Sequence, residues 1–294
     1  MRADRDAVPV TVAIPTIGRL EPIRRCLESL RACVPSPAEI LVVDQSHEPT
    51  LVELVAEVVG DHRARVVPSR GLGVARARND GLRAAAHPVV LVTDDDCTVP
   101  VDWVGTGHRL TAAYPGAIVT GRVLPVGDPR AVPSTKDDPV PVDLSSERRG
   151  GWLFGNNMAL PCAAVLDLGG FDERFGPEEA AEDNEFCYRW LRAGRPLRYE
   201  PSFLVQHHDW RSPDELERLY VRYARGEGFF YAKHLRHGDL RMLRFVIRDL
   251  AWGVRALGSG LLKGRESWTD SRRGVFKGMP GGFAAGWRVF GKER

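Results

Sequence analysis

The chain has 294 residues, 43% of them hydrophobic and 27% charged, which fits a soluble globular protein with one large α/β domain or one domain and an appendage. The net charge is only +2, but residues 211–294 hold 18 Lys/Arg against 9 Asp/Glu, so an acidic body is followed by a basic tail. Five scattered cysteines without a CxxC pair argue against a zinc site and a disulfide scaffold, and the absence of an 18-residue apolar run argues against a transmembrane helix.

The ends of the chain bear on its location. Residues 1–9 are charged and lack the apolar core of a signal peptide. With unpaired cysteines this favours the cytoplasm. The basic tail adds an alternative, a peripheral position on the inner face of the membrane, because basic segments bind anionic surfaces. Aromatic residues in the tail stand beside aliphatic ones at helical spacing, which suits a core or a bilayer face better than a stacking platform, so we expect no nucleic-acid partner.

Short apolar runs alternate with helical patterns through the first 125 residues. This alternation, with short connections, predicts a doubly wound, mostly parallel sheet of Rossmann-like α/β type. The expected strands are 10–14, 39–43, 64–67, 89–93 and 117–123, and the expected helices are 19–32, 51–59, 74–86 and 103–114.

Carboxylates follow two of these strands. Asp44-Gln45-Ser46 ends the second strand, and Asp94-Asp95-Asp96 ends the fourth. In an open α/β sheet, ligands bind at the carboxyl ends of the strands. Three adjacent carboxylates need neutralisation, and a divalent cation shared with substrate phosphates supplies it. The alternative is a solvated acidic turn that caps the next helix.

The middle of the chain is less regular. Residues 125–150 are rich in proline and predict a long loop, which is either a lid over an active face or a surface excursion. Residues 155–160 predict a short strand, 169–173 a tight turn, and the residues from Phe186 an amphipathic helix that ends at Gly194. Two short strands, 197–199 and 203–206, come next, followed by His207-His208.

The tail is helical and basic. Residues 240–262 carry apolar side chains at helical spacing with arginines between them, which is typical of a helix that lies on an anionic bilayer. Packing of the same apolar face on the body is the alternative. The glycine-rich segment 278–294 is a further candidate for docking on protein or lipid.

Several motifs, in this order, resemble the inverting family 2 glycosyltransferases of the GT-A fold. The motifs are Val12-Ala13-Ile14-Pro15-Thr16, Val42-Val43-Asp44-Gln45-Ser46, Asn79 with Gly81, the DxD motif Asp94-Asp95-Asp96, Gly169-Gly170-Phe171-Asp172-Glu173 and Glu182-Asp183. The resemblance implies a GT-A catalytic domain over residues 8–210, followed by the basic helical region 211–294. The family often has Asp-Asp-Gly-Ser in place of Asp44-Gln45-Ser46, which leaves the base of the nucleotide open.

The resemblance implies metal-assisted transfer of a sugar from a nucleoside diphosphate, of UDP or TDP type, to an acceptor hydroxyl. The acceptor is a glycan, a lipid-linked glycan or a small molecule, in cell-envelope or glycoconjugate biosynthesis. Mn²⁺ or Mg²⁺ is expected on Asp96, with Asp94 and a histidine after the last strand, His207 in preference to His208, as further ligands. The implied nucleotide-sugar contacts are Pro15, Thr16, Arg19, Asp44, Ser46, Arg76, Asn79, Asp94 and Asp95.

Inverting transfer also needs a general base within hydrogen-bond reach of the acceptor hydroxyl. Asp183 is the expected base and Glu182 the second choice. The alternative is that both acids only supply negative charge at a helix N-terminus, where the helix dipole stabilises carboxylates. Expected on the acceptor side are Trp152, Asn156 and Asp172.

Two other functions fit part of the pattern. A nucleotidyltransferase that makes sugar nucleotides shares the sheet and the acidic site, but it usually has a glycine-rich loop after the first strand, where this chain has Pro15 to Arg19. A sugar-nucleotide-binding, membrane-associated protein without turnover is the other. The retained Asp96 and Asp183 argue against it.

Overall fold

The computed structural model describes residues 7–60, 63–129, 132–145, 153–208, 212–263 and 268–292. Contacts within the chain define two compact units. The sheet unit comprises residues up to Glu173 together with Asp183–Asp209. The helical unit comprises Arg174–Glu182 and the residues from Trp210 onward.

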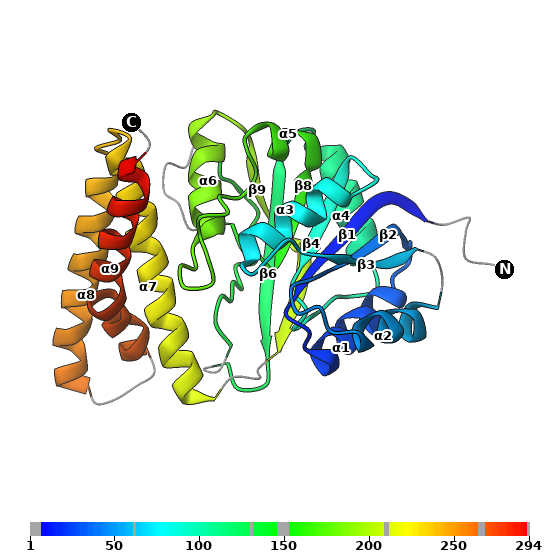
Figure 1. Cartoon of the computed structure of the whole chain (residues 1–294), viewed down its shortest axis with the longest axis horizontal. Helices are drawn as coiled ribbons and strands as arrows, with labels where there is room; N and C mark the ends of the chain where they lie inside the picture. The colour runs from blue at the N-terminus through cyan, green and yellow to red at the C-terminus, as the bar shows by residue number, and fades with distance from the viewer. Residues whose placement is uncertain are drawn as a thin grey trace. The chain divides into compact units, whose positions relative to one another are not determined.

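The sheet unit is built on a nine-stranded sheet with the order β3-β2-β1-β4-β8-β6-β9-β5, with β7 paired to β9 (Figure 1). Strands β1 to β4 are parallel, whereas β8 runs antiparallel to both β4 and β6. The strands are β1 Val8–Thr16, β2 Pro37–Asp44, β3 Ala64–Pro68, β4 Val89–Thr93, β5 Cys97–Thr98, β6 Ile118–Val126, β7 Val142–Asp143, β8 Asn157–Pro161 and β9 Leu197–His208.

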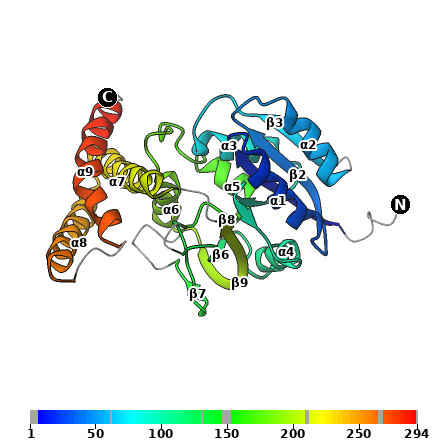
Figure 2. The same ribbon diagram turned by 90° about the horizontal axis from the view of Figure 1, so that it is seen from below.

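Helices cover both faces of this sheet, because the inner strands are apolar on both sides. One apolar cluster joins α1, α2 and α4 to the sheet, and another joins α3, α5 and α6 to the opposite face (Figure 2). The helices are α1 Leu20–Arg31, α2 Thr50–Val59, α3 Val74–Ala84, α4 Trp103–Ala113, α5 Cys162–Asp167 and α6 Glu182–Arg192.

Strand β9 differs from the prediction. The sequence suggested two short strands with His207 after them, but Leu197–His208 is one twelve-residue strand. Its register against β6 shifts between Gly121 and Arg122. A Cβ on Gly121 would lie 1.7 Å from the carbonyl oxygen of Phe203, so only glycine fits at this irregularity. The irregularity lets the strand continue, which places His207 opposite Cys97 of β5.

The helical unit contains α7 Pro213–Arg236, α8 Met242–Lys263, α9 Trp268–Val289 and the short η1 Phe290–Lys292. Ser212 begins α7 with a capping box, in which its side chain and that of Glu215 exchange hydrogen bonds with backbone N–H groups. None of the helices in the described part of the chain is both long and apolar enough to cross a bilayer.

The glycine-rich segment near the C-terminus forms the second half of α9, which the sequence analysis did not predict. Glycine and Pro280 disfavour helix in isolation. Glycines four residues apart here allow the backbones of α7 and α9 to touch. A Cβ on Gly278 would lie 2.2 Å from the Val221 oxygen, and one on Gly282 would lie 1.8 Å from the Arg225 oxygen. Tertiary packing therefore outweighs local propensity.

Candidate active site

The three consecutive aspartates form a tight turn after β4, closed by a hydrogen bond from the Cys97 N–H to the Asp94 oxygen (3.1 Å). The turn points its carboxylates in different directions. Asp95 and Asp96 are buried, whereas the Asp94 side chain is 31% exposed. The three acids therefore have three different sets of neighbours.

Asp95 is held by the loop that follows β1. The Thr16 hydroxyl donates to its Oδ2 at 2.6 Å, and the guanidinium of Arg19 binds both of its oxygens. Burial raises the pKa of Asp95 to about 6, and the Arg19 charge opposes that shift. Arg19 also donates to Asp96 Oδ2 at 3.1 Å. Asp95 thus ties the predicted nucleotide-side loop to the end of β4.

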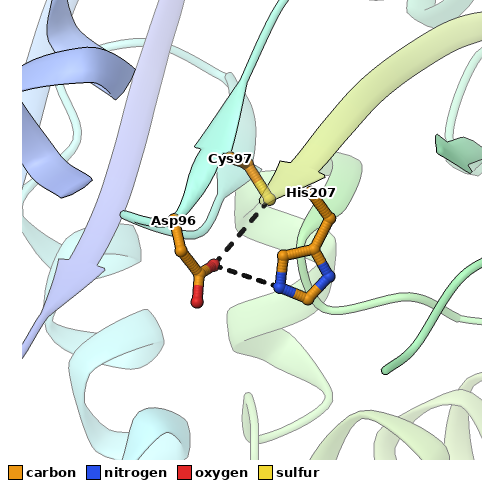
Figure 3. Close-up of side chains that lie close together, drawn as sticks. All are labelled: Asp96, Cys97 and His207. Carbon is orange, nitrogen blue, oxygen red and sulfur yellow. Dashed lines mark hydrogen bonds and ion pairs between the residues drawn. The ribbon is translucent and has the colours of Figure 1, made fainter. Parts of the chain in front are cut away.

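Asp96 faces a histidine and a thiol. Its Oδ1 lies 3.4 Å from His207 Nε2 and 4.0 Å from the Cys97 sulfur, and the three groups point toward one another (Figure 3). His207 Nδ1 lies 3.0 Å from the Pro133 carbonyl oxygen. Since a carbonyl oxygen can only accept, Nδ1 donates to it, and this bond turns Nε2 of the ring toward Asp96. Burial raises the pKa of the Cys97 thiol.

This set fits a divalent cation. A carboxylate, an imidazole nitrogen and a thiol offer ligand atoms that all lie within 4.8 Å of one another, and all three residues are buried. The predicted ligands Asp96 and His207 are therefore brought together. Cys97 joins them, and Asp94 lies outside the group.

Asp94 has a cationic neighbour of its own. Its Oδ1 lies 3.6 Å from the Arg78 guanidinium, which is almost fully buried on α3. Arg78 also stands 5.6 Å from the Phe171 ring centroid, and a Cβ on Gly155 would lie 2.1 Å from its Nη2. A buried cation beside the acidic turn is a feature that the sequence analysis did not single out.

The end of β2 meets the end of β1 at this same edge. Asp44 pairs in register with Thr16, and its Oδ1 accepts from the Ser46 N–H (2.8 Å) and hydroxyl (2.6 Å). Gln45 donates to the Thr16 oxygen at 3.4 Å and accepts from the Gly73 N–H at 2.8 Å. Pro15 pairs with Val43 in the same ladder. The strand-end residues predicted for the nucleotide therefore converge.

The other two predicted nucleotide contacts have protein partners. Glu173 accepts from Arg76 Nε at 3.2 Å and from Asn79 Nδ2 at 3.1 Å. Asn79 also exchanges two hydrogen bonds with the Phe171 backbone, at 2.7 and 2.9 Å. These contacts fasten the 169–173 turn to α3. A direct role for Arg76 or Asn79 in donor binding stays a prediction.

The expected base lies beside the start of β8. The Gly155 N–H donates to Asp183 Oδ2 at 3.3 Å, and the Asn184 N–H donates to its Oδ1 at 2.8 Å. Asn156, which follows Gly155, is buried, and its Oδ1 has no hydrogen-bond partner among the described residues. Glu182 is buried as well. Ala181 has a φ of +148°, a conformation that side chains rarely adopt and that is found at functional sites.

The other two expected acceptor-side residues are Asp172 and Trp152. Asp172 is half-buried in the 169–173 turn. Trp152 lies outside the described residues.

Comparison with known proteins decides the family. The model of glycosyl transferase family 2 matches residues 11–162, slightly more than half of the chain. The chain belongs to glycosyl transferase family 2. The resemblance seen in the motifs is thereby confirmed, and the matched segment contains the nucleotide-side loop, the end of β2 and the DxD motif.

Two curated relatives share about a quarter to a third of their aligned residues with this chain. A pre-mycofactocin glycosyltransferase of Mycobacterium tuberculosis is 30% identical over 273 residues, which cover 86% of this chain and 53% of that protein. The chain thus spans about half the length of this relative. The glucosyl-dolichyl phosphate glucuronosyltransferase of Haloferax volcanii is 24% identical over 73% of either chain.

A solved structure supports the fold. A mannosyltransferase from Pyrobaculum calidifontis, in complex with GDP-Man and Mn²⁺, superposes with a TM-score of 0.63 at 19% identity, over 93% of this chain and 86% of that one. This likeness confirms the GT-A type of α/β sheet.

Arg78 and Cys97 belong to the site, but the sequence motifs did not identify them. Arg78 shares the buried face of α3 with Ala75 and Leu82, at spacings of three and four, and a cation on an apolar stripe was a usable signal. Cys97 gave no such signal. Its partner His207 is 110 residues away, and only the pairing of β5 with β9 brings the two together.

Proposed function

We propose that the chain is an inverting, metal-dependent glycosyltransferase that moves a sugar from a nucleoside diphosphate, of UDP or TDP type, to an acceptor hydroxyl. The observation that carries this proposal is the buried Asp96–His207–Cys97 group. It lies at the edge of the sheet where Thr16, Arg19 and Asp44 also lie. A sugar nucleotide needs a nucleoside pocket and a cation for its diphosphate side by side. Family membership and the Mn²⁺ complex of a protein with the same fold support the proposal.

The donor side follows from this arrangement. Mn²⁺ or Mg²⁺ held by Asp96 and His207 would supply Lewis-acid stabilisation of the diphosphate leaving group. Arg19 and Thr16 fix Asp95, so the loop after β1 is held in place before the donor arrives. We assign Asp44 and Ser46 to the nucleoside, because their side chains end β2 at the same edge.

The acceptor side centres on Asp183. Two backbone N–H groups bind its two oxygens and so fix the orientation of the carboxylate. We assign it the role of general base that removes the proton of the attacking hydroxyl, with Glu182 as the second choice. Asn156, whose buried Oδ1 has no partner in the part of the chain that the structure describes, is assigned to an acceptor or donor hydroxyl.

A thermal-shift panel tests the donor side. UDP, TDP, GDP, ADP and CDP are each added with and without Mn²⁺. We expect one nucleotide, UDP or TDP, to raise the melting temperature only when Mn²⁺ is present. At 100 times its dissociation constant it stabilises the fold by about 2.7 kcal/mol, a shift of several degrees. Stabilisation by no nucleotide, with or without the cation, contradicts the proposed donor site.

Helix α8 supports a membrane surface as a further partner, which suits a lipid-linked acceptor in envelope glycan synthesis. Large apolar side chains recur at helical spacing along α8 and are exposed, namely Leu243 (47%), Ile247 (65%) and Val254 (61%). We call these the α8 apolar stripe. An arginine directly follows each of them, at Arg244, Arg248 and Arg255. This is the pattern of a helix at the interface of an anionic bilayer.

The charges favour lipid over a second copy of the chain. The acid Asp249 accepts from the Tyr231 hydroxyl at 2.5 Å and from Arg248, so it is already engaged within the helical unit. Two copies that paired through the stripe would bring arginines together. Anionic lipid instead contributes about 1 kcal/mol per basic residue near its surface.

Co-sedimentation with anionic vesicles at low salt tests this surface. The double variant Leu243→Glu/Ile247→Glu is expected to bind at least about tenfold more weakly, a loss of about 1.4 kcal/mol. The matched control is Val52→Glu/Val101→Glu, which changes two exposed valines of the sheet unit and the same net charge. The assignment to α8 fails if the unaltered protein stays in the supernatant or if the control loses binding equally.

A further inference from the structure

We propose that Cys97 is a third protein ligand of the metal centre, so that the site takes thiophilic divalent cations such as Zn²⁺, Co²⁺ and Cd²⁺ more tightly than Mn²⁺ or Mg²⁺. This inference rests on the metal site of the proposed function and deepens it by naming the donor set and the class of cation. It also revises an expectation from the sequence. Scattered cysteines argued against zinc, but that argument covers only sites built from cysteine pairs.

The pairing of β5 with β9 creates the site. Cys97 and His207 lie directly opposite each other in an antiparallel ladder. Side chains at such a pair leave the sheet on the same face, with Cβ atoms about 4.5–5.5 Å apart. Asp96 is the residue before Cys97 and ends the acidic turn. Two paired strands and a tight turn therefore fix all three donors.

The two separations from Asp96 Oδ1 are close to those around a single ion. Metal–ligand distances of about 2.3 Å to sulfur and about 2.0–2.1 Å to nitrogen and oxygen, at tetrahedral angles, place oxygen and nitrogen about 3.3 Å apart and sulfur and oxygen about 3.6 Å apart. Asp96 Oδ1 lies 3.4 Å from His207 Nε2 and 4.0 Å from Cys97 Sγ. The first separation already matches. The second needs a shift of a few tenths of an ångström.

The environment also matches a cation that prefers nitrogen and sulfur. The Pro133 carbonyl fixes the His207 ring with its Nε2 toward Asp96, as the carbonyl partners of metal-bound histidines do. All three residues are buried, so their ligand atoms are shielded from bulk solvent. Thiolate and imidazole ligands favour Zn²⁺ and Co²⁺ over the oxygen-seeking Mn²⁺ and Mg²⁺.

Cobalt spectroscopy tests the thiolate directly. Titration of the whole chain with Co²⁺ is expected to give a sulfur-to-cobalt charge-transfer band in the near ultraviolet. Cys97→Ser and Cys97→Ala are both expected to lose this band while keeping the melting curve of a folded protein. Cys162→Ser is the matched control, because Cys162 is also a buried thiol, at the start of α5, and donates instead to the Leu82 oxygen. The control is expected to keep the band.

Competition completes the test. In the unaltered protein Zn²⁺ is expected to displace Mn²⁺, and Cys97→Ser is expected to weaken Zn²⁺ binding at least about tenfold while changing Mn²⁺ binding little. Co²⁺ that binds by calorimetry without a band, or a band that persists in both Cys97 variants, overturns the inference. Mn²⁺-dependent transfer with no thiolate band removes Cys97 from the site and leaves the proposed function standing. A protein that binds neither Co²⁺ nor Mn²⁺ overturns both.

Discussion

Asp96→Asn is expected to lower kcat/KM by at least about a thousandfold, or about 4 kcal/mol of transition-state stabilisation. Asparagine keeps the volume of the side chain but removes the charge that faces His207 and Arg19. The divalent cation then loses its only anionic oxygen ligand in the Asp96–His207–Cys97 group. The same variant is expected to lose the Mn²⁺-dependent thermal shift with the donor nucleotide.

The control for this variant is Asp167→Asn. It makes the same chemical change at an exposed acid at the end of α5. Activity and nucleotide binding are both expected to stay near their original values. Circular dichroism and melting curves for both variants separate loss of the site from loss of the fold. An Asp96→Asn enzyme that keeps a tenth or more of its activity shows that the group does not hold the catalytic cation.

Asp183→Asn is expected to lower kcat by about 10²–10⁴-fold, the usual contribution of a positioned general base. Donor affinity should change little, because the effect lies on the acceptor side. The acid limb of the kcat–pH profile, which reports deprotonation of the base, should vanish with the carboxylate. Steady-state kinetics across pH, together with the nucleotide thermal shift, separate these effects.

The stability of this variant needs its own measurement. An asparagine oxygen can accept from either the Gly155 or the Asn184 N–H, but its NH₂ then faces the other donor. The unmade hydrogen bond costs about 1–3 kcal/mol of the free energy of unfolding. Glu178→Gln, at an exposed acid five residues upstream, is the control and is expected to change neither kcat nor the free energy of unfolding. If Asp183→Asn also leaves kcat within threefold, the general base is another group.

The sequence sufficed for the parts of the site that depend on parallel strands. Apolar runs marked β1, β2 and β4, and the carboxyl ends of parallel strands meet at one edge. Thr16 and Asp44 pair in register, and Thr16 also reaches Asp95 across from β4. Local patterns therefore predicted this convergence without knowledge of the tertiary fold.

The parts that failed depend on long-range pairing. Strand β5 has only two residues and no pattern of its own, so nothing local indicates that Cys97 opposes His207. The irregularity at Gly121 joins two predicted short strands into one, and it is set by contact with Phe203. Helix α9 contains the residues that normally end helices. It forms because its glycines pack on α7, and local propensity does not include that contact.

The route of the chain between Arg174 and Glu182 determines how the protein can be divided. This short segment belongs to the helical unit although it precedes α6. Phe175 packs edge-on against Phe229 at 4.9 Å, Glu179 pairs with Arg225 at 2.9 Å, and a Cβ on Gly226 would lie 1.4 Å from the Ala180 oxygen. A truncation near residue 210 therefore removes the packing partners of a segment that it leaves behind, next to the candidate base. The helical unit therefore cannot be removed without consequence for the sheet unit. A shortened protein has to keep the helical unit or redesign residues 174–182.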